Sequence, residues 1–148
     1  MFLGQYQHNL DDKGRLMIPA RFRQLLDGDA FITQGFDKCL MVMTGSYFKQ
    51  VYERIEAMNL ADPTARLLRR LILSNAYPVE VDKIGRMLVP QNLRTFLAIE
   101  NGELVVAGQG EYFEVWMPVL WSEQMTQLQD TEANKARFST LDLSKTQS

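Results

Sequence analysis

The sequence has little of several features on which common classes of protein depend. Its 148 residues include one cysteine and one histidine. Cys39 alone cannot form an internal disulfide or a cysteine-rich zinc site, and His8 alone excludes any site that needs two histidines. No apolar run approaches the roughly 18 residues of a membrane span. The N-terminus lacks the basic and apolar regions of a signal peptide. We therefore expect a soluble cytoplasmic protein with no membrane partner.

An excess of basic residues is also absent. Lys and Arg number 16 against 18 Asp and Glu, which gives a formal net charge of −2 at pH 7. DNA-binding domains usually carry a basic excess, so this balance counts against nucleic acid as a partner. The total does not reveal where the charges lie, however, and a local basic surface remains compatible with it.

The sequence contains an internal duplication. Segment 11–26 recurs at 82–97 with a constant offset of 71 residues; six of the 16 aligned pairs are identical and five more are apolar in both copies. This fixed register predicts two tandem half-domains related by a pseudo-twofold axis, because solenoid repeats are shorter and more numerous. The identical pairs are Asp11/Asp82, Gly14/Gly85, Arg15/Arg86, Pro19/Pro90, Arg23/Arg94 and Leu26/Leu97.

The residue pattern of each repeat predicts a strand, a turn, a second strand, a short helix, two more strands and a longer helix. Pro19 and Pro90 suit the first turns of the short helices. Ser46 is the expected cap of a helix over 47–58, and Asp62 that of a helix reaching about residue 75. Pro118 starts a helix to about residue 128. The expected strands are 6–10, 15–18, 30–33, 39–43, 79–81, 87–89, 103–107 and 112–116.

Neither half has enough strands to bury a core alone, so the two should close one barrel. We expect an α+β fold with a mainly β core and peripheral helices. The first repeat with its following helix would cover 1–60, a connecting helix 61–76 and the second repeat with its helix 77–129. Residues 130–148 lose the periodic apolar positions and predict a flexible tail.

The two matched turns carry the candidate site. Segments 11–23 and 82–94 each have a net charge of +2, which leaves −6 for the rest of the chain. In an Asp-x-x-x-Arg turn the Asp can accept backbone N–H bonds, and the Gly supplies a positive φ. The planar Arg fork can then take a phosphate or the edge of guanine. The competing interpretation is that Asp and Arg merely pair with each other across the turn.

The chain resembles the bacterial MraZ family from Met1 to about Gln129. The resemblance rests on the paired motifs, on the Pro that follows each of them and on the strand 113–116. The resemblance implies a duplicated AbrB-like swapped-hairpin barrel. It also implies a nucleoid-associated regulator that represses its own division and cell-wall gene cluster. Such a regulator would bind short direct repeats in promoter DNA as a ring-like homo-oligomer.

By position, the resemblance also implies roles for the motif residues. Arg15 and Arg86 would be the principal DNA contacts, with Lys13 and Lys83 as neighbouring phosphate contacts. The two loops are not equivalent, because Lys13 is matched by Ile84. The loop-supporting residues would be Asp11, Gly14, Asp82 and Gly85.

Two other functional classes, an adaptor protein and an enzyme, are alternatives to DNA binding. The chain could be an oligomeric adaptor whose ring binds another protein through the apolar faces of its helices. Core packing or contact between subunits is the favoured explanation of the apolar positions Leu67, Leu68, Leu71 and Ile72. An enzyme is disfavoured, because Ser46 and Ser74 lack a nucleophile signature and Cys39 lies in an apolar run. We expect no cofactor, metal or small-molecule ligand. The residues alone leave open whether Arg21, Arg23, Arg94 or the face of Arg66, Arg69 and Arg70 touches DNA.

Overall fold

The computed structural model describes residues 1–144 and divides the chain into two compact units. The first unit runs from Met1 to Pro118, and the second begins at Val119. The first contains both copies of the duplicated motif. Within the part of the chain that the structure describes, no helix has the length and apolar character needed to cross a membrane.

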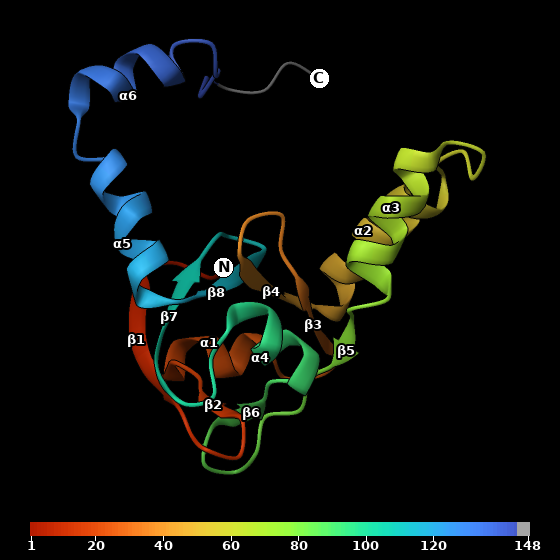
Figure 1. Ribbon diagram of the computed structural model, residues 1–148, viewed down its shortest axis with the longest axis vertical. Helices are drawn as coiled ribbons and strands as arrows, with labels where there is room; N and C mark the ends of the chain where they lie inside the picture. The colour runs from red at the N-terminus through yellow and green to blue at the C-terminus, as the bar shows by residue number, and fades with distance from the viewer. Residues whose placement is uncertain (145–148) are drawn as a thin grey trace. The chain divides into compact units, whose positions relative to one another are not determined.

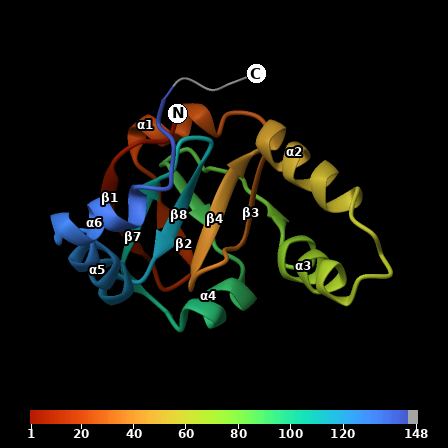
Figure 2. The same cartoon turned by 90° about the horizontal axis from the view of Figure 1, so that it is seen from above.

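An eight-stranded antiparallel sheet forms the body of the first unit (Figure 1). Its strands are β1 (Gln5–Leu10), β2 (Arg15–Met17), β3 (Ala30–Gln34), β4 (Cys39–Thr44), β5 (Tyr77–Pro78), β6 (Arg86–Leu88), β7 (Gly102–Gly108) and β8 (Tyr112–Trp116). They lie in the order β5-β3-β4-β8-β7-β1-β2-β6. The sheet curls, and Figure 2 shows α1 (Ala20–Leu25) above the strands and α4 (Gln91–Leu97) below them. This architecture confirms the α+β fold with a mainly β core.

The two repeats interleave within this sheet. Strands β2 and β6 pair about Leu16 and Met87, which are matched positions of the duplication. Strands β4 and β8 pair about Met41 and Glu114 in the same symmetric way. Strand β1 of the first repeat also pairs with β7 of the second, and β5 of the second pairs with β3 of the first. Each repeat therefore completes the sheet of the other, which explains why one copy would not bury its core.

Matched apolar positions of the duplication form the centre of this unit. The ring of Phe22 lies 5.1 Å from that of Phe2, 5.4 Å from that of Tyr6 and 5.2 Å from that of Phe113, between centroids. Leu93, which the duplication aligns with Phe22, comes from α4 and is equally buried. The short helices thus supply the core from both sides of the pseudo-twofold axis.

Two longer helices, α2 (Gly45–Glu56) and α3 (Pro63–Leu73), follow the first repeat and pack on β3 and β4. The buried Thr33 hydroxyl donates to the carbonyl of Ile72 at 2.6 Å, which ties α3 to the sheet. Asp62 caps α3 as expected, because its Oδ1 accepts from the N–H of Thr64 at 2.9 Å. The helix ends at Leu73, two residues before its expected end at about residue 75.

The cap of α2 corrects the sequence-based expectation. The helix begins at Gly45 and its cap is Thr44, whose hydroxyl accepts from the N–H of Tyr47 at 3.3 Å. Ser46 is the second residue of the helix and hydrogen-bonds with the Thr44 hydroxyl. Both are good capping residues, and the end of β4 decides which one precedes the first turn.

This correction gives a matched pair of variants. Thr44→Ala should lower the free energy of unfolding by about 1 kcal/mol, because it leaves an N–H group of the first turn without its acceptor. Ser46→Ala should change it by less than about 0.5 kcal/mol. Chemical denaturation of the two variants measures both values, and equal losses would contradict the assignment of Thr44 as the cap.

One further expectation is wrong, and one helix was not expected. The predicted strand at 79–81 is replaced by β5 at Tyr77–Pro78 and a single bridge from Val81 to Met87. The reason is that residues 79–85 connect β5 and β6, the two ends of the sheet order, so they cannot follow one ladder. The predicted tail contains a helix, α6 (Thr131–Phe138), capped by Asp130. It has no buried residue and hence no apolar period to reveal it.

The helix expected to start at Pro118 is present. Helix α5 (Pro118–Gln127) begins at the predicted proline and ends one residue before the predicted position. The last four residues of the predicted tail, 145–148, lie outside the described residues.

Candidate nucleic-acid interface

The first Asp-x-x-x-Arg loop is organised around the carboxylate of Asp11. Its Oδ1 accepts hydrogen bonds from the backbone N–H of Lys13 at 3.0 Å and of Arg15 at 2.8 Å. The N–H of Gly14 donates to the Asp11 carbonyl at 3.1 Å. Gly14 has a φ of +82°, which L side chains rarely adopt. The side chain of Asp11 therefore holds the turn that leads into β2.

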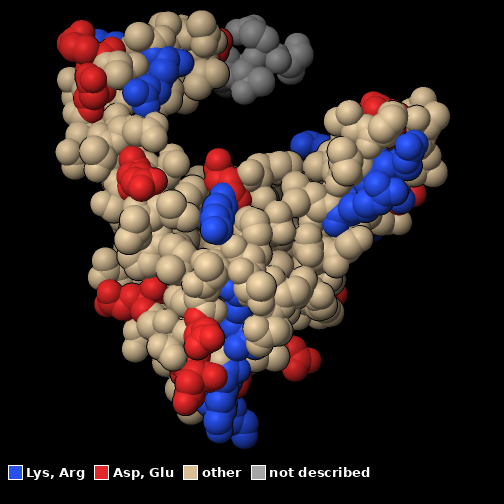
Figure 3. Space-filling view, in the orientation of Figure 1, with Lys and Arg blue, Asp and Glu red and all other residues tan. Residues whose placement is uncertain are grey.

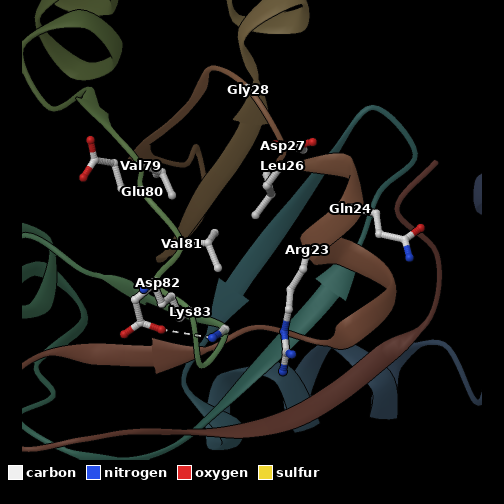
Figure 4. Close-up of a pocket in the computed structure, with 11 residues that line it drawn as sticks. Arg23, Gln24, Leu26, Asp27, Gly28, Val79, Glu80, Val81, Asp82 and Lys83 are labelled. Carbon is white, nitrogen blue, oxygen red and sulfur yellow. Dashed lines mark hydrogen bonds between the residues drawn. The ribbon is translucent and has the colours of Figure 1, made fainter.

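The second loop repeats this geometry. Oδ1 of Asp82 accepts from the N–H groups of Ile84 at 3.0 Å, Gly85 at 3.0 Å and Arg86 at 2.9 Å. Gly85 has a φ of +103°. The dashed line in Figure 4 marks a hydrogen bond of Asp82 within this loop. Two copies of one motif thus make two similar turns that the pairing of β2 with β6 brings together.

Each arginine of the motif pairs with its own aspartate. Nε of Arg15 lies 3.0 Å from Oδ2 of Asp11, and Nε of Arg86 lies 3.0 Å from Oδ2 of Asp82. Nη1 of Arg86 also lies 3.8 Å from Oδ2 of Asp11, so the two loops touch. The arginine side chains keep 34% and 23% of their surface exposed. Pairing across each turn and access from solvent therefore occur together, because the ion pair within each loop uses Nε.

Hydrogen bonding favours the charged form of both aspartates. The backbone N–H of Arg15, followed by its side chain, lowers the pKa of Asp11 below the ordinary 3.8. The backbone N–H of Arg86, again with its side chain, lowers the pKa of Asp82. Both carboxylates are consequently ionised at neutral pH and keep the turns in place.

These pKa shifts predict the behaviour of the loops in acid. Because the folded-state pKa lies below the unfolded one, the stabilisation is present above about pH 4 and is lost as pH falls through the lowered pKa. An NMR titration of the carboxyl carbons should give both aspartates midpoints below 3.8. Arg15→Ala should raise the midpoint of Asp11 and leave that of Asp82 in place; a midpoint of Asp11 unaffected by this change would contradict the pairing.

The two lysines of the loops are exposed, and Figure 3 shows basic and acidic side chains together at this end of the unit. Residues 11–15 have no net charge and residues 82–86 carry +1. The excess of +2 in each longer segment therefore comes largely from Arg21, Arg23 and Arg94, which lie outside the loops. The net charge of the loops themselves is therefore a weaker indication of DNA binding than the charge of +2 on each longer segment.

Arg23 and Arg94, whose role the sequence left open, make internal contacts. Nε of Arg23 donates to the carbonyl of Ile18 at 2.9 Å, and Nε of Arg94 donates to that of Val89 at 3.0 Å. Arg23 also borders an open pocket of about 570 Å³ that Asp82 and Lys83 line from the other repeat (Figure 4). The signal for this arrangement is the identity of Arg23 and Arg94 in the duplication, which sequence reasoning did not exploit.

The third group of arginines lies on α3, away from the loops, where Figure 3 shows a basic stripe. Arg69 pairs with Glu56 at 3.2 Å, between Nη2 and Oε2, and Arg66 donates to the carbonyl of Leu60 at 2.8 Å. Both side chains thus fasten α3 to the preceding segment. The structure does not bring this face together with the two loops.

The other two singled-out side chains, Cys39 and His8, both have shifted pKa values. Cys39 is buried, and burial together with the nearby Glu114 raises the pKa of its thiol well above the usual range. Burial, followed by the charge of Arg23, lowers the pKa of His8. Among residues 1–144, no three His, Cys, Asp or Glu side chains gather in a way that could hold a metal ion.

Comparison with known proteins agrees with the duplication of the sequence. A family model described as "MraZ protein, putative antitoxin-like" matches residues 1–71 and 72–142. The two matches begin 71 residues apart, the offset of the duplication. Relatives of similar length are named transcriptional regulator MraZ. The protein of Roseiflexus sp. (strain RS-1) is 39% identical over 93% of this chain and 94% of its own.

Two further relatives support the same assignment. The transcriptional regulator MraZ of Thermomicrobium roseum is 40% identical over 84% of this chain and 87% of its own. That of Desulfitobacterium hafniense (strain Y51) is 39% identical over 92% of this chain and 94% of its own. The twofold match and these identities over most of the length agree, and the chain belongs to the MraZ family.

Proposed function

We propose that this chain is a sequence-specific DNA-binding regulator of transcription and that the two Asp-x-x-x-Arg loops read the DNA. The observation that carries the proposal is the juxtaposition of the two loops, with Arg86 3.8 Å from Asp11 of the other repeat. Relatives of the same length are named transcriptional regulators, which favours this role. The proposed DNA contacts are Arg15 and Arg86, with Lys13 and Lys83 beside them.

The loops are preorganised for this task. Each aspartate holds the Nε edge of its arginine, so little side-chain freedom is lost when the fork meets an acceptor. The Nη groups can donate to O6 and N7 of guanine or to a phosphate. The exposed Ile84 stands where the first loop has Lys13. At this position we expect the second loop to make an apolar contact, such as one with a thymine methyl group, while Lys83 and Arg86 supply its contacts with phosphate or guanine.

Four cationic side chains per chain make a small DNA-binding surface, so one subunit should bind weakly. We infer that several subunits of a ring-like homo-oligomer engage short direct repeats in the promoter, which raises affinity through effective concentration. On this proposal the chain acts at the nucleoid and represses its own division and cell-wall gene cluster. Its net charge of −2 limits adhesion to unrelated DNA.

A binding titration tests the proposal. The full chain is titrated with a duplex from the region upstream of its own gene and with a duplex of the same composition and scrambled order. We expect tighter binding to the first, and a log–log salt slope of about −0.9 per phosphate neutralised. A footprint should show protection at regular intervals.

Equal affinity for the two duplexes, or none for either, would overturn the proposal and favour the adaptor. Leu67 on α3 is 63% exposed and would be available to a protein partner, whereas Ile72, five residues later in the same helix, is buried.

A further inference from the structure

Two arginines at matched positions of the repeats each reach the loop of the opposite repeat. Arg23 lies in α1, and its guanidinium packs against Gly85 of the second loop. Arg94 lies in α4, and its guanidinium packs against Gly14 of the first loop. A Cβ at either glycine would overlap the guanidinium. Both glycines are therefore needed for this contact as well as for their positive φ.

Hydrogen bonds fix each arginine in this crossed position. The N–H of Ile18 donates to the carbonyl of Gly85 at 2.9 Å, and the carbonyl of Ile18 accepts from Nε of Arg23 at 2.9 Å. Ile18 thus links the second loop, through Gly85, to Arg23 of the first repeat. The matched bonds run from Val89 N–H to the Gly14 carbonyl at 2.8 Å and from Arg94 Nε to the Val89 carbonyl at 3.0 Å.

We propose that Arg23 and Arg94 are positioning residues, each holding the DNA-reading loop of the other repeat. Arg94 would then act through the loop of Arg15, and Arg23 through the loop of Arg86. The inference rests on the proposed function of these loops. Both arginines are half-buried, each guanidinium lies against a glycine of the opposite loop, and each Nε donates to an internal carbonyl, so these contacts join parts of the protein.

The chemistry of the contact requires arginine. A planar guanidinium can cover the flat face of a glycine and donate from Nε at the same time, whereas a lysine ammonium can do only one. Glycine in turn is the residue that allows the plane to come close. Both kinds of residue occur in both copies of the duplication: Gly14 is matched by Gly85, and Arg23 is matched by Arg94.

Amide hydrogen exchange of the full chain without DNA tests the crossed contact. Arg94→Met removes the guanidinium and leaves an apolar stem. It should speed exchange of the Lys13 and Arg15 amides about tenfold and leave those of the second loop within about twofold. Arg23→Met should do the reverse. Arg21→Met, which removes an exposed arginine from the same helix, is the matched control and should change neither loop.

A response of both loops to one variant, or of the loop in the variant's own repeat alone, would overturn the proposal. If the methionine variants do not fold, the Arg23→Lys and Arg94→Lys variants replace them. These keep the charge and lose the planar fork, so the same crossed pattern is expected, and exchange rates equal to those of the parent would overturn the inference.

A double-mutant cycle on DNA affinity separates positioning from direct contact. If Arg94 acts through the first loop, Arg94→Met should cost little in an Arg15→Ala background and its full effect in an Arg86→Ala background. Equal losses in both backgrounds would mean that Arg94 touches DNA itself, against the proposal. Failure of the parent to bind DNA would overturn the proposed function, whereas the crossed exchange pattern would still support the loop-holding role of the two arginines.

Discussion

Removing both motif arginines should abolish most of the DNA affinity of this protein. Arg15→Ala and Arg86→Ala should each cost about 1–3 kcal/mol of binding free energy per engaged site, because each takes away a bidentate donor for guanine or phosphate. Together they should cost about 2–6 kcal/mol, and more when several subunits share one DNA. A titration on the promoter duplex, with the oligomeric state checked beside it, measures the loss.

Two control variants separate the effect of positive charge on DNA affinity from the effect of the shape of the arginine side chain. Arg21→Ala removes one positive charge from an exposed position outside the loops and should change the affinity only slightly. Arg15→Lys keeps the charge but not the fork, so it should retain salt-dependent binding and lose discrimination between duplexes. Parent-like affinity in a folded, oligomeric double variant would rule out the two arginines as the DNA contacts.

Truncation of Phe22 should produce the largest loss of stability. Its side chain is 1% exposed, and three aromatic rings contact it. Phe22→Ala should lower the free energy of unfolding by about 3–5 kcal/mol, because it removes apolar burial and leaves a cavity between the repeats. Guanidinium chloride unfolding followed by fluorescence measures the change.

Phe36 provides the matched control for this experiment, since its side chain is 72% exposed. Phe36→Ala should change the free energy of unfolding by less than about 0.5 kcal/mol. Similar losses in the two variants would show that Phe22 does not occupy the centre of the core.

Much of the fold could be predicted because local signals and the duplication agree. The turn at Asp11–Arg15, the strand at Tyr112–Trp116 and the helix start at Pro63 all follow from residue types with strong local preferences. Errors arose where two local choices were equally good, as at Thr44 and Ser46, or where no apolar period exists, as in α6. In those places the surrounding chain makes the choice.

The loops show the same division within the candidate site. By itself, the sequence determined the duplication, the turns and the side chains at their tips, because these depend on residue type and spacing over a few positions. Only the tertiary structure decided that Arg23 packs against Gly85 and that Arg94 packs against Gly14. The reason is that β2 pairs with β6 across the pseudo-twofold axis, which brings together residues about 60 to 80 positions apart that no local preference connects.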